Sequence, residues 1–417
     1  MPFRLKLVVS VLFVALIAIL LSLFLITCQD TDSSFEKQYH SLVDPYHFSL
    51  FGWEIRTLYN QAKQSVVKVQ PDSSYNSETV LQYFSLIDQL HNLKTNIQFK
   101  NKNDDVNDTE KRLAKLEDQI ATLKPIVEQI IEKQLSLTLA EQGIFNPISN
   151  NWLKAILPPV NFVLEDPPYI LVISPKNKIE RMRETILIQD LSSAQIEELE
   201  SSLEKLNVSA LVESLGGLGA TYPSFVEANS LRFTINTATE EWLHQYLAFK
   251  PLGFRYILNL LGLNLDADIP TINETLASLI SKELGELVYT KYYPQEQTNV
   301  NTGSSDQATL SFDFNKEMRE IRLTVDNYLA LGEIAQAEQF MKDKRLFLES
   351  KGYYIRKLNQ AYFAFYGSYA DSPTSINPIG EKLRLLRKNS SSIKDFLEIA
   401  SDFSSKQDLD QAVDLCK

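Results

Sequence analysis

Cysteine and histidine are both scarce in this chain, and each scarcity limits the chemistry available to it. Among 417 residues there are two cysteines and four histidines. Cys28 and Cys416 lie near opposite ends of the sequence, so the chain has no disulfide framework. A site that needs an imidazole must therefore use one of four positions. These are His40, His47, His91 and His244.

Positive charge is also in short supply, which argues against a nucleic-acid partner. Lysine and arginine number 41 against 53 acidic residues, for a net charge of −12. Nucleic-acid binding requires a basic surface that displaces counterions, and no dense stripe of lysine and arginine is present. The glycine-rich segment at residues 216–223 lacks the G-x-G-x-x-G spacing of a nucleotide loop. It is expected to form a turn that leads into a strand at residues 224–228.

One long apolar run is present, at residues 7–26. About 20 apolar residues cross a hydrocarbon core of roughly 30 Å, whereas the apolar part of a cleaved signal has only about 7 to 15. Arg4 and Lys6 precede the run, and this bias favours a cytoplasmic N-terminus. The sequence therefore predicts a cytoplasmic segment at residues 1–6, a transmembrane anchor at residues 7–26, and a single-pass protein of the cell membrane with an extracytoplasmic C-terminal domain.

Cys28 leaves the processing of this segment open. The preceding residues Leu25-Ile-Thr27 resemble a bacterial lipoprotein signal, in which the cysteine would be lipidated. Lipidation at Cys28, a plain spanning anchor and full release are three alternatives. All three predict the same compartment for the rest of the chain.

Hydrophobic periodicity predicts an extracytoplasmic helical region at residues 27–157. Helical spacing of apolar residues is present at residues 36–67 and 76–97. A long amphipathic helix is expected at residues 109–139, with a kink or a division at Pro125.

Residues 158–417 are predicted to form a second, α+β domain. The β-rich runs at residues 169–174 and 185–188 indicate a small sheet. Ser192-Ser-Ala-Gln195 matches a capping box at the start of a helix. The chain is thus expected to be predominantly helical with a small sheet. Further helices are predicted at residues 231–249, 251–263, 271–290, 313–331, 333–350, 353–370, 377–388 and 391–404.

Two short segments on predicted helices carry the pattern most informative about chemistry. In H-E-x-x-H, the two histidines stand one helical turn apart and bind zinc. The glutamate between them deprotonates the water molecule bound to the zinc. Residues 240–244 read E-E-W-L-H, so the last four positions fit and the first does not. Residues 273–278 read N-E-T-L-A-S, in which a glutamate is followed one turn later by small residues.

These segments belong to a wider resemblance that covers residues 167–403. The chain resembles a group of uncharacterised bacterial membrane-anchored proteins that are similar to gluzincin-type zinc metalloproteases. The resemblance is specific in combination, although each fragment alone is weak. The matching segments are Pro251–Gly253, Asn273–Ser278, Phe312–Phe314, Glu317–Arg319 and Lys357–Asp371.

The resemblance implies a gluzincin-like metallopeptidase domain at residues 158–417, which acts on a peptide or protein substrate. It implies that His244 and Glu274 bind the metal, with Glu240 in the position of the missing histidine, and that Glu241 is the general base. A tyrosine among Tyr362, Tyr366 and Tyr369 is expected to stabilise the oxyanion, with Tyr366 and Tyr369 as the candidates.

Glu240 is the departure that matters most, because the related pattern has a zinc-binding histidine there. A second carboxylate lowers the formal charge of a divalent site from about +1 to about 0, which makes the metal less electrophilic. One alternative is a metal site, for zinc or a harder ion such as manganese, with altered activity. A second alternative is a retained fold that has lost catalysis and metal, as a peptide-binding or scaffold protein. Coincidence on two surface helices is the third.

Overall fold

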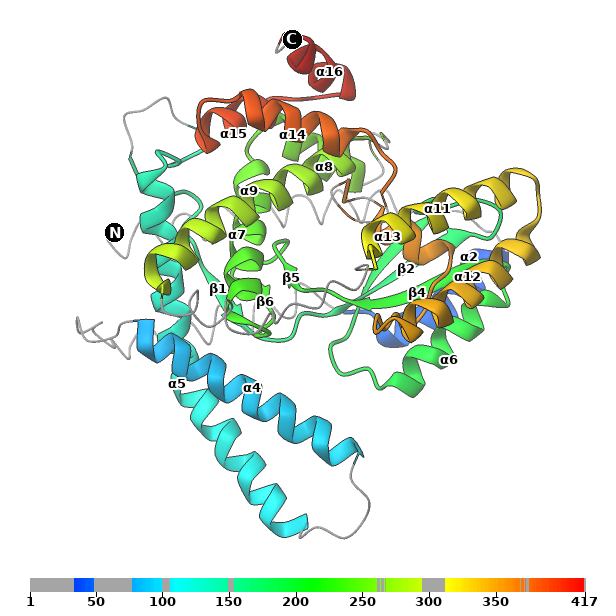
Figure 1. Ribbon diagram of the computed structural model, residues 1–417, viewed down its shortest axis with the longest axis horizontal. Helices are drawn as coiled ribbons and strands as arrows, with labels where there is room; N and C mark the ends of the chain where they lie inside the picture. The colour runs from blue at the N-terminus through cyan, green and yellow to red at the C-terminus, as the bar shows by residue number, and fades with distance from the viewer. Residues whose placement is uncertain are drawn as a thin grey trace.

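Over the residues that the structure describes, the chain folds into a mostly helical structure with two three-stranded sheets. These features are seen in a computed structural model, in which helices surround both sheets (Figure 1). The structure describes residues 34–48, 77–99, 106–148, 154–260, 263, 266, 268–294, 312–367, 369–370, 372 and 375–415.

The predicted transmembrane element requires a correction. Within the described ranges, no helix is both long and apolar enough to cross a membrane. The longest, α5 (Val106–Glu141), has charged residues along its whole length. The anchor predicted at residues 7–26 and the lipidation alternative at Cys28 lie outside the described residues. The membrane-spanning part of the fold class and the single-pass localisation are therefore withdrawn.

The described N-terminal helices pack into cores that they share with later elements of the chain. Helix α4 (Ser77–Phe99) and α5 make a hairpin whose far end extends from the body of the molecule (Figure 1). Helix α5 continues through Pro125, so of the two alternatives predicted there the division is wrong, and the kink stays a prediction. Beyond it, Val127 and Ile131 are fully buried in the same core as α7 and α9.

The first sheet has the order β3-β2-β4 and is antiparallel throughout. Its strands are β2 (Tyr169–Pro175), β3 (Arg183–Leu187) and β4 (Val208–Ser214). Leu171 faces Thr185 on one side and Val212 on the other. The predicted strands at residues 169–174 and 185–188 are thus confirmed to within a few residues, whereas β4 was not predicted.

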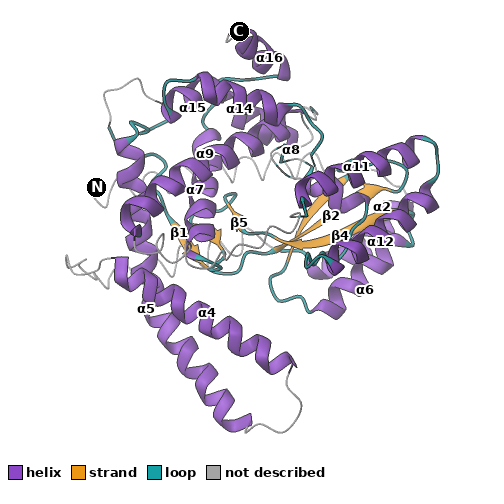
Figure 2. Cartoon of the chain, in the orientation of Figure 1, coloured by secondary structure: helices purple, strands orange, loops and turns teal. Residues whose placement is uncertain are grey.

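Helices cover both faces of this sheet (Figure 2). Helix α2 (Ser34–Val43), followed by a short 3-10 turn at Asp44–Tyr46, and α6 (Ser193–Glu204) pack on one face. The predicted capping box between Ser192 and Gln195 is present at the start of α6. The other face is covered by three later helices. They are α11 (Phe314–Ala330), α12 (Ile334–Ser350) and α13 (Gln360–Tyr366).

Helix α13 is much shorter than the helix predicted at residues 353–370. It begins after Asn359, whose side-chain oxygen accepts a hydrogen bond from Tyr362 N and whose amide donates to Ala210 O in β4. The helix ends at Tyr366, before Gly367. Tertiary hydrogen bonding therefore sets the start of this helix.

The second sheet is smaller and lies beside the larger helical part. Its order is β1-β6-β5, with β1 (Phe162–Leu164) parallel to β6 (Ser224–Val226) and β5 (Gly217–Leu218) antiparallel to β6. The strand predicted at residues 224–228 is present in shortened form. The preceding glycine segment, predicted as a turn, contains the edge strand β5.

The remaining helices form the largest core, around α7 and α9. Helix α7 begins after Ser230, whose side chain accepts a hydrogen bond from Phe233 N. The helices are α7 (Leu231–Leu247), α8 (Pro251–Leu260), α9 (Asp268–Tyr292), α14 (Ile379–Asn389), α15 (Ile393–Ser401) and α16 (Lys406–Asp414).

Gly253 allows α8 to begin directly against the end of α7. A Cβ at this position would overlap the backbone carbonyl of Leu247, which cannot move aside as a flexible side chain can. The close approach fixes the direction of α8 and therefore the position of the side chains that α8 presents to α9.

Substitution of Gly253 by alanine is expected to lower the free energy of unfolding by about 2 kcal/mol, the usual scale for an overpacked contact. Urea denaturation monitored by circular dichroism measures the change. The neighbouring Phe254, which is 54% exposed, provides the control, and its replacement by alanine should change stability by less than about 0.5 kcal/mol. Equal stability of Gly253→Ala and the wild type would contradict this packing.

Candidate metal centre

Glu240 and His244 stand one turn apart on α7, opposite Glu274 of α9. Residues four apart on a helix share a face, and here that face meets α9. His244 Nε2 lies 3.4 Å from Glu274 Oε2. One ligand atom from each of the three side chains lies within 4.8 Å of the other two. This Glu-His-Glu group can therefore hold a divalent metal ion.

Two hydrogen bonds orient the histidine and the glutamate that face each other. His244 Nδ1 lies 2.9 Å from Asn273 Oδ1, and Asn273 is almost completely buried. Because an amide oxygen only accepts, Nδ1 carries the proton in this contact, and Nε2 is directed to Glu274. The Tyr256 hydroxyl donates to Glu274 Oε1 at 2.6 Å. Tyr256, on α8, was not singled out by the sequence pattern.

Without metal, His244 and Glu274 form a largely buried ion pair, with side-chain exposures of 18% and 9%. Burial alone would lower the pKa of His244, but the neighbouring Glu274 carboxylate raises it above the usual imidazole value. Burial alone would raise the pKa of Glu274, but the charge and hydrogen bond of His244 and the hydrogen bond from Tyr256 lower it. A proton on His244 thus balances the carboxylate where a metal ion would otherwise do so.

Glu241 lies beside the metal group and beneath the edge strand β5. Burial raises the pKa of Glu241 to about 8; the charge of His244 opposes this shift, while Glu240 and Glu274 add to it. The Gly219 backbone N–H donates a hydrogen bond to its carboxylate. A carboxyl group with a pKa near neutrality is suited to accept and return a proton at physiological pH.

The glycines of the β5 segment are needed for this arrangement. A Cβ on Gly217 would lie 2.5 Å from Glu241 Oε1, and one on Gly219 would lie 2.7 Å from Oε2. Gln245, one turn further along α7, holds the same segment by donating to Thr221 O at 2.8 Å. The sequence signal for this contact is the glycine run itself, which predicts only a turn.

Of the predicted tyrosines, the structure brings Tyr369 to the metal group. The negative charge of Glu274, together with burial and the charges of Glu240 and Glu241, raises the pKa of Tyr369 well above its usual value. The hydroxyl therefore remains a hydrogen-bond donor. Its position is fixed by the next residue, since Ala370 N donates to Thr275 Oγ1 at 2.9 Å, directly beside Glu274.

Tyr366 lies elsewhere. Its ring packs against Tyr362 with centroids 4.5 Å apart, in the core between the first sheet and the helices α11 to α13. The charges that act on it are those of Glu213 and Arg356, and none belongs to the metal group. Tyr362 and Tyr366 are therefore packing residues in this structure.

A charged pair from the first sheet forms part of the surroundings. Arg181, in the connection between β2 and β3, donates to Ala364 O and Phe365 O, each at 3.1 Å, which ties this connection to α13. Its Nη1 lies 2.8 Å from Glu184 Oε1. The charges of Glu184 and Glu274 both act on Arg181, so this guanidinium contributes positive potential near the metal group.

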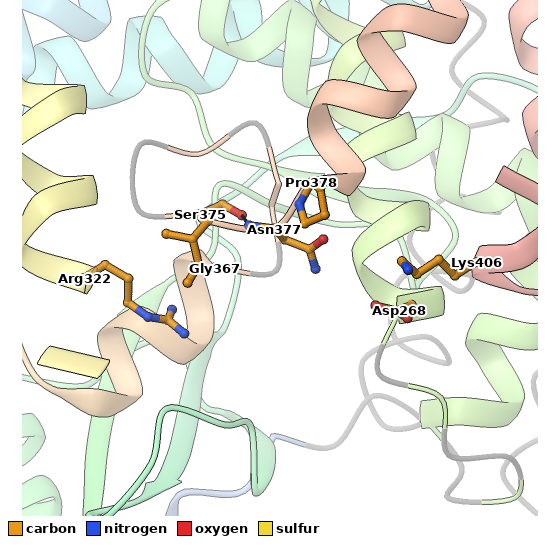
Figure 3. A pocket seen from close by; sticks show the side chains of 8 residues that line it. Asp268, Arg322, Gly367, Ser375, Asn377, Pro378 and Lys406 are labelled. Atoms are coloured by element: carbon orange, nitrogen blue, oxygen red, sulfur yellow. Dashed lines mark hydrogen bonds between the residues drawn. The ribbon is translucent and has the colours of Figure 1, made fainter. Parts of the chain in front are cut away.

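A polar cavity of about 410 Å³ lies along the loop that follows α13, with Arg322 and Lys406 among its lining residues (Figure 3). Asp268, the first residue of α9, and Gly367 also line it. None of the predicted site residues is among the residues that line it. It is therefore distinct from the metal group.

Comparisons with known proteins add no family to this picture. No protein-family model matches the chain, and neither a curated protein nor a solved structure matches it. The gluzincin resemblance therefore stays a prediction from the sequence segments alone.

The geometry predicts that the purified protein binds one divalent ion per chain. Replacement of His244 by alanine is expected to weaken zinc binding at least about 100-fold, because it removes the only imidazole of the group. Competition titration with a chromophoric chelator measures the affinity. His91→Ala, which removes an exposed histidine of α4, should leave it unchanged. Equal affinities of the two variants would rule out the metal group.

The metal-free protein is expected to lose stability as the pH rises from neutral to alkaline values. The raised pKa of His244 means that its contribution is complete below about pH 6.5 and is lost above it. The raised pKa of Glu241 acts in the same direction, since ionisation of this buried group on the way to pH 8 destabilises the folded state.

Thermal denaturation in a chelator, followed over the alkaline range, measures this effect, with a slope of up to about 1.4 kcal/mol per pH unit for each proton. In His244→Ala the slope above about pH 6.5 should become shallower, whereas in His91→Ala it should match the wild type. A wild-type stability that is flat over this range would contradict the assigned ion pair.

Proposed function

We propose that this chain is a metallopeptidase-like protein that binds a divalent metal through Glu240, His244 and Glu274 and hydrolyses peptide bonds slowly. The observation that carries the proposal is the convergence of these three side chains from two helices, with a third carboxylate, Glu241, beside them. A hydrolytic site of this kind requires all four groups in one place.

The residues present fit a divalent ion. Two carboxylates and one imidazole are acceptable ligands for zinc and also for manganese. His244 Nδ1 donates its hydrogen bond to Asn273, which leaves Nε2 as the ligand atom. A metal-binding histidine usually makes such a hydrogen bond through its other ring nitrogen. Mutual repulsion of three neighbouring carboxylates is relieved when a cation binds among them.

The bound metal would supply Lewis-acid polarisation of the scissile carbonyl and of the attacking water. Glu241 accepts a proton from that water as its oxygen attacks the carbonyl carbon. The same carboxyl group then donates the proton to the departing amine nitrogen as the carbon–nitrogen bond breaks. The Tyr369 hydroxyl donates a hydrogen bond to the carbonyl oxygen as negative charge develops on it.

Glu240 explains why slow hydrolysis is proposed. With two carboxylates and one neutral imidazole, the formal charge of the loaded group is about 0, compared with about +1 for two imidazoles and one carboxylate. The metal is then a weaker electrophile. The alternative is a peptide-binding or scaffold protein in which metal binds without turnover, or does not bind at all.

Mutation of the proton-transfer and oxyanion residues tests this proposal on the metal-loaded protein. Glu241→Gln is expected to retain metal and to reduce peptide hydrolysis by at least about 100-fold, and Tyr369→Phe by about 10- to 1,000-fold. Mass spectrometry of a peptide library incubated with each variant gives the rates. The matched control is Tyr366→Phe, which alters a packing tyrosine of the same segment and should keep the wild-type rate.

Glu240→His tests for a gain of function, because it restores the formal charge that the metal-loaded group has with two histidines and one glutamate. We expect it to raise both the affinity for zinc and the rate of peptide hydrolysis. Hydrolysis that persists in Glu241→Gln would contradict the assigned general base. Metal binding without hydrolysis, even in Glu240→His, would favour the non-catalytic alternative.

A further inference from the structure

Tyr256 makes a short hydrogen bond to the metal group from outside it. Its hydroxyl donates to Glu274 Oε1 at 2.6 Å, and its ring lies 6.4 Å from the His244 ring, centroid to centroid. A tyrosine hydroxyl is protonated at neutral pH and a carboxylate oxygen only accepts, so the phenol is the donor in this contact.

The two oxygens of Glu274 have different partners. Oε1 accepts the hydrogen bond from Tyr256, and Oε2 is the atom directed at His244 Nε2. A hydrogen bond to a buried carboxylate is strong and directional. It therefore holds one oxygen away from the centre and presents the other to the position of the cation.

The packing of α8 makes this contact rigid. Gly253 lets α8 approach the end of α7, as described above, and places Tyr256 over α9. The charges of Arg181 and Glu184 also act on Tyr256, so its hydroxyl lies where the first sheet approaches the helices. The phenol thus occupies a fixed position between two parts of the molecule.

We propose that Tyr256 is a positioning residue that makes Glu274 a one-oxygen metal ligand and thereby leaves a coordination position open for water or substrate. This inference rests on the proposed function, because it concerns the same site. A carboxylate released from Tyr256 would be able to bind the ion through both oxygens, which would fill that position.

The test uses the full-length protein, freed of metal and reloaded with cobalt or zinc. In Tyr256→Phe, zinc affinity is expected to fall by about 10- to 100-fold, as for other outer hydrogen-bond partners of metal ligands. The visible absorption of bound cobalt is expected to weaken, because higher coordination numbers give weaker bands. A purely structural tyrosine would not change this spectrum at full metal occupancy.

The matched control is Tyr246→Phe, which removes the hydroxyl of another buried tyrosine, packed against Trp242 on α7. It should keep the wild-type affinity and cobalt spectrum. Thermal denaturation of each metal-free variant confirms folding, and Tyr256→Leu repeats the test if Tyr256→Phe is unstable.

Each outcome has a separate meaning. A wild-type protein that binds metal through His244, combined with an unchanged affinity and spectrum in Tyr256→Phe, overturns the role of Tyr256 and leaves the proposed function intact. A wild-type protein that binds no metal overturns both. Weaker affinity together with an altered cobalt spectrum supports the positioning role.

Discussion

The buried pairing of His244 with Glu274 is the interaction around which the helical part of the molecule is arranged. A charge removed from water is costly unless it has a partner and hydrogen bonds. Here the two groups are held in register by Asn273 and Tyr256. The pairing requires α7 and α9 to meet at one point, and both helices pack in the largest core. A proton and a metal ion are two ways to satisfy the same electrostatic requirement.

The effect of Glu240 and Glu241 on stability and on metal binding follows from this pairing. They add negative charge next to a group that is already balanced, and part of that charge is removed by protonation, as the pKa of about 8 at Glu241 indicates. An excess of carboxylates that is unfavourable for folding is favourable for a cation site. The stability of the metal-free protein and its affinity for metal are therefore opposing consequences of the same side chains.

Sequence periodicity predicted the helices of the site and the strands β2 and β3 of the first sheet. The elements that it missed have physical causes. Strand β4 was missed because both of its faces are covered, so Val208–Val212 is buried throughout and lacks the alternation of a half-exposed strand. The choice between Tyr366 and Tyr369 was not available from the sequence, because a continuous helix was expected where Gly367 follows the end of α13. Tyr256 and the β5 glycines depend on contacts between elements distant in sequence.

Because the second half of α5 packs in the same core as α7 and α9, it limits where the chain can be truncated without loss of the fold. The boundary predicted between residues 157 and 158 follows a change in the sequence pattern. The second half of α5 precedes this boundary in the sequence, yet it packs in the core of the elements that follow the boundary. A fragment that begins at residue 158 would lose the helix that packs on β1 and α9, and with it the hydrogen-bond partners of Phe162 N and of the buried Tyr293 hydroxyl. The smallest autonomous unit therefore includes the second half of α5, and a truncated protein designed for crystallisation should retain it.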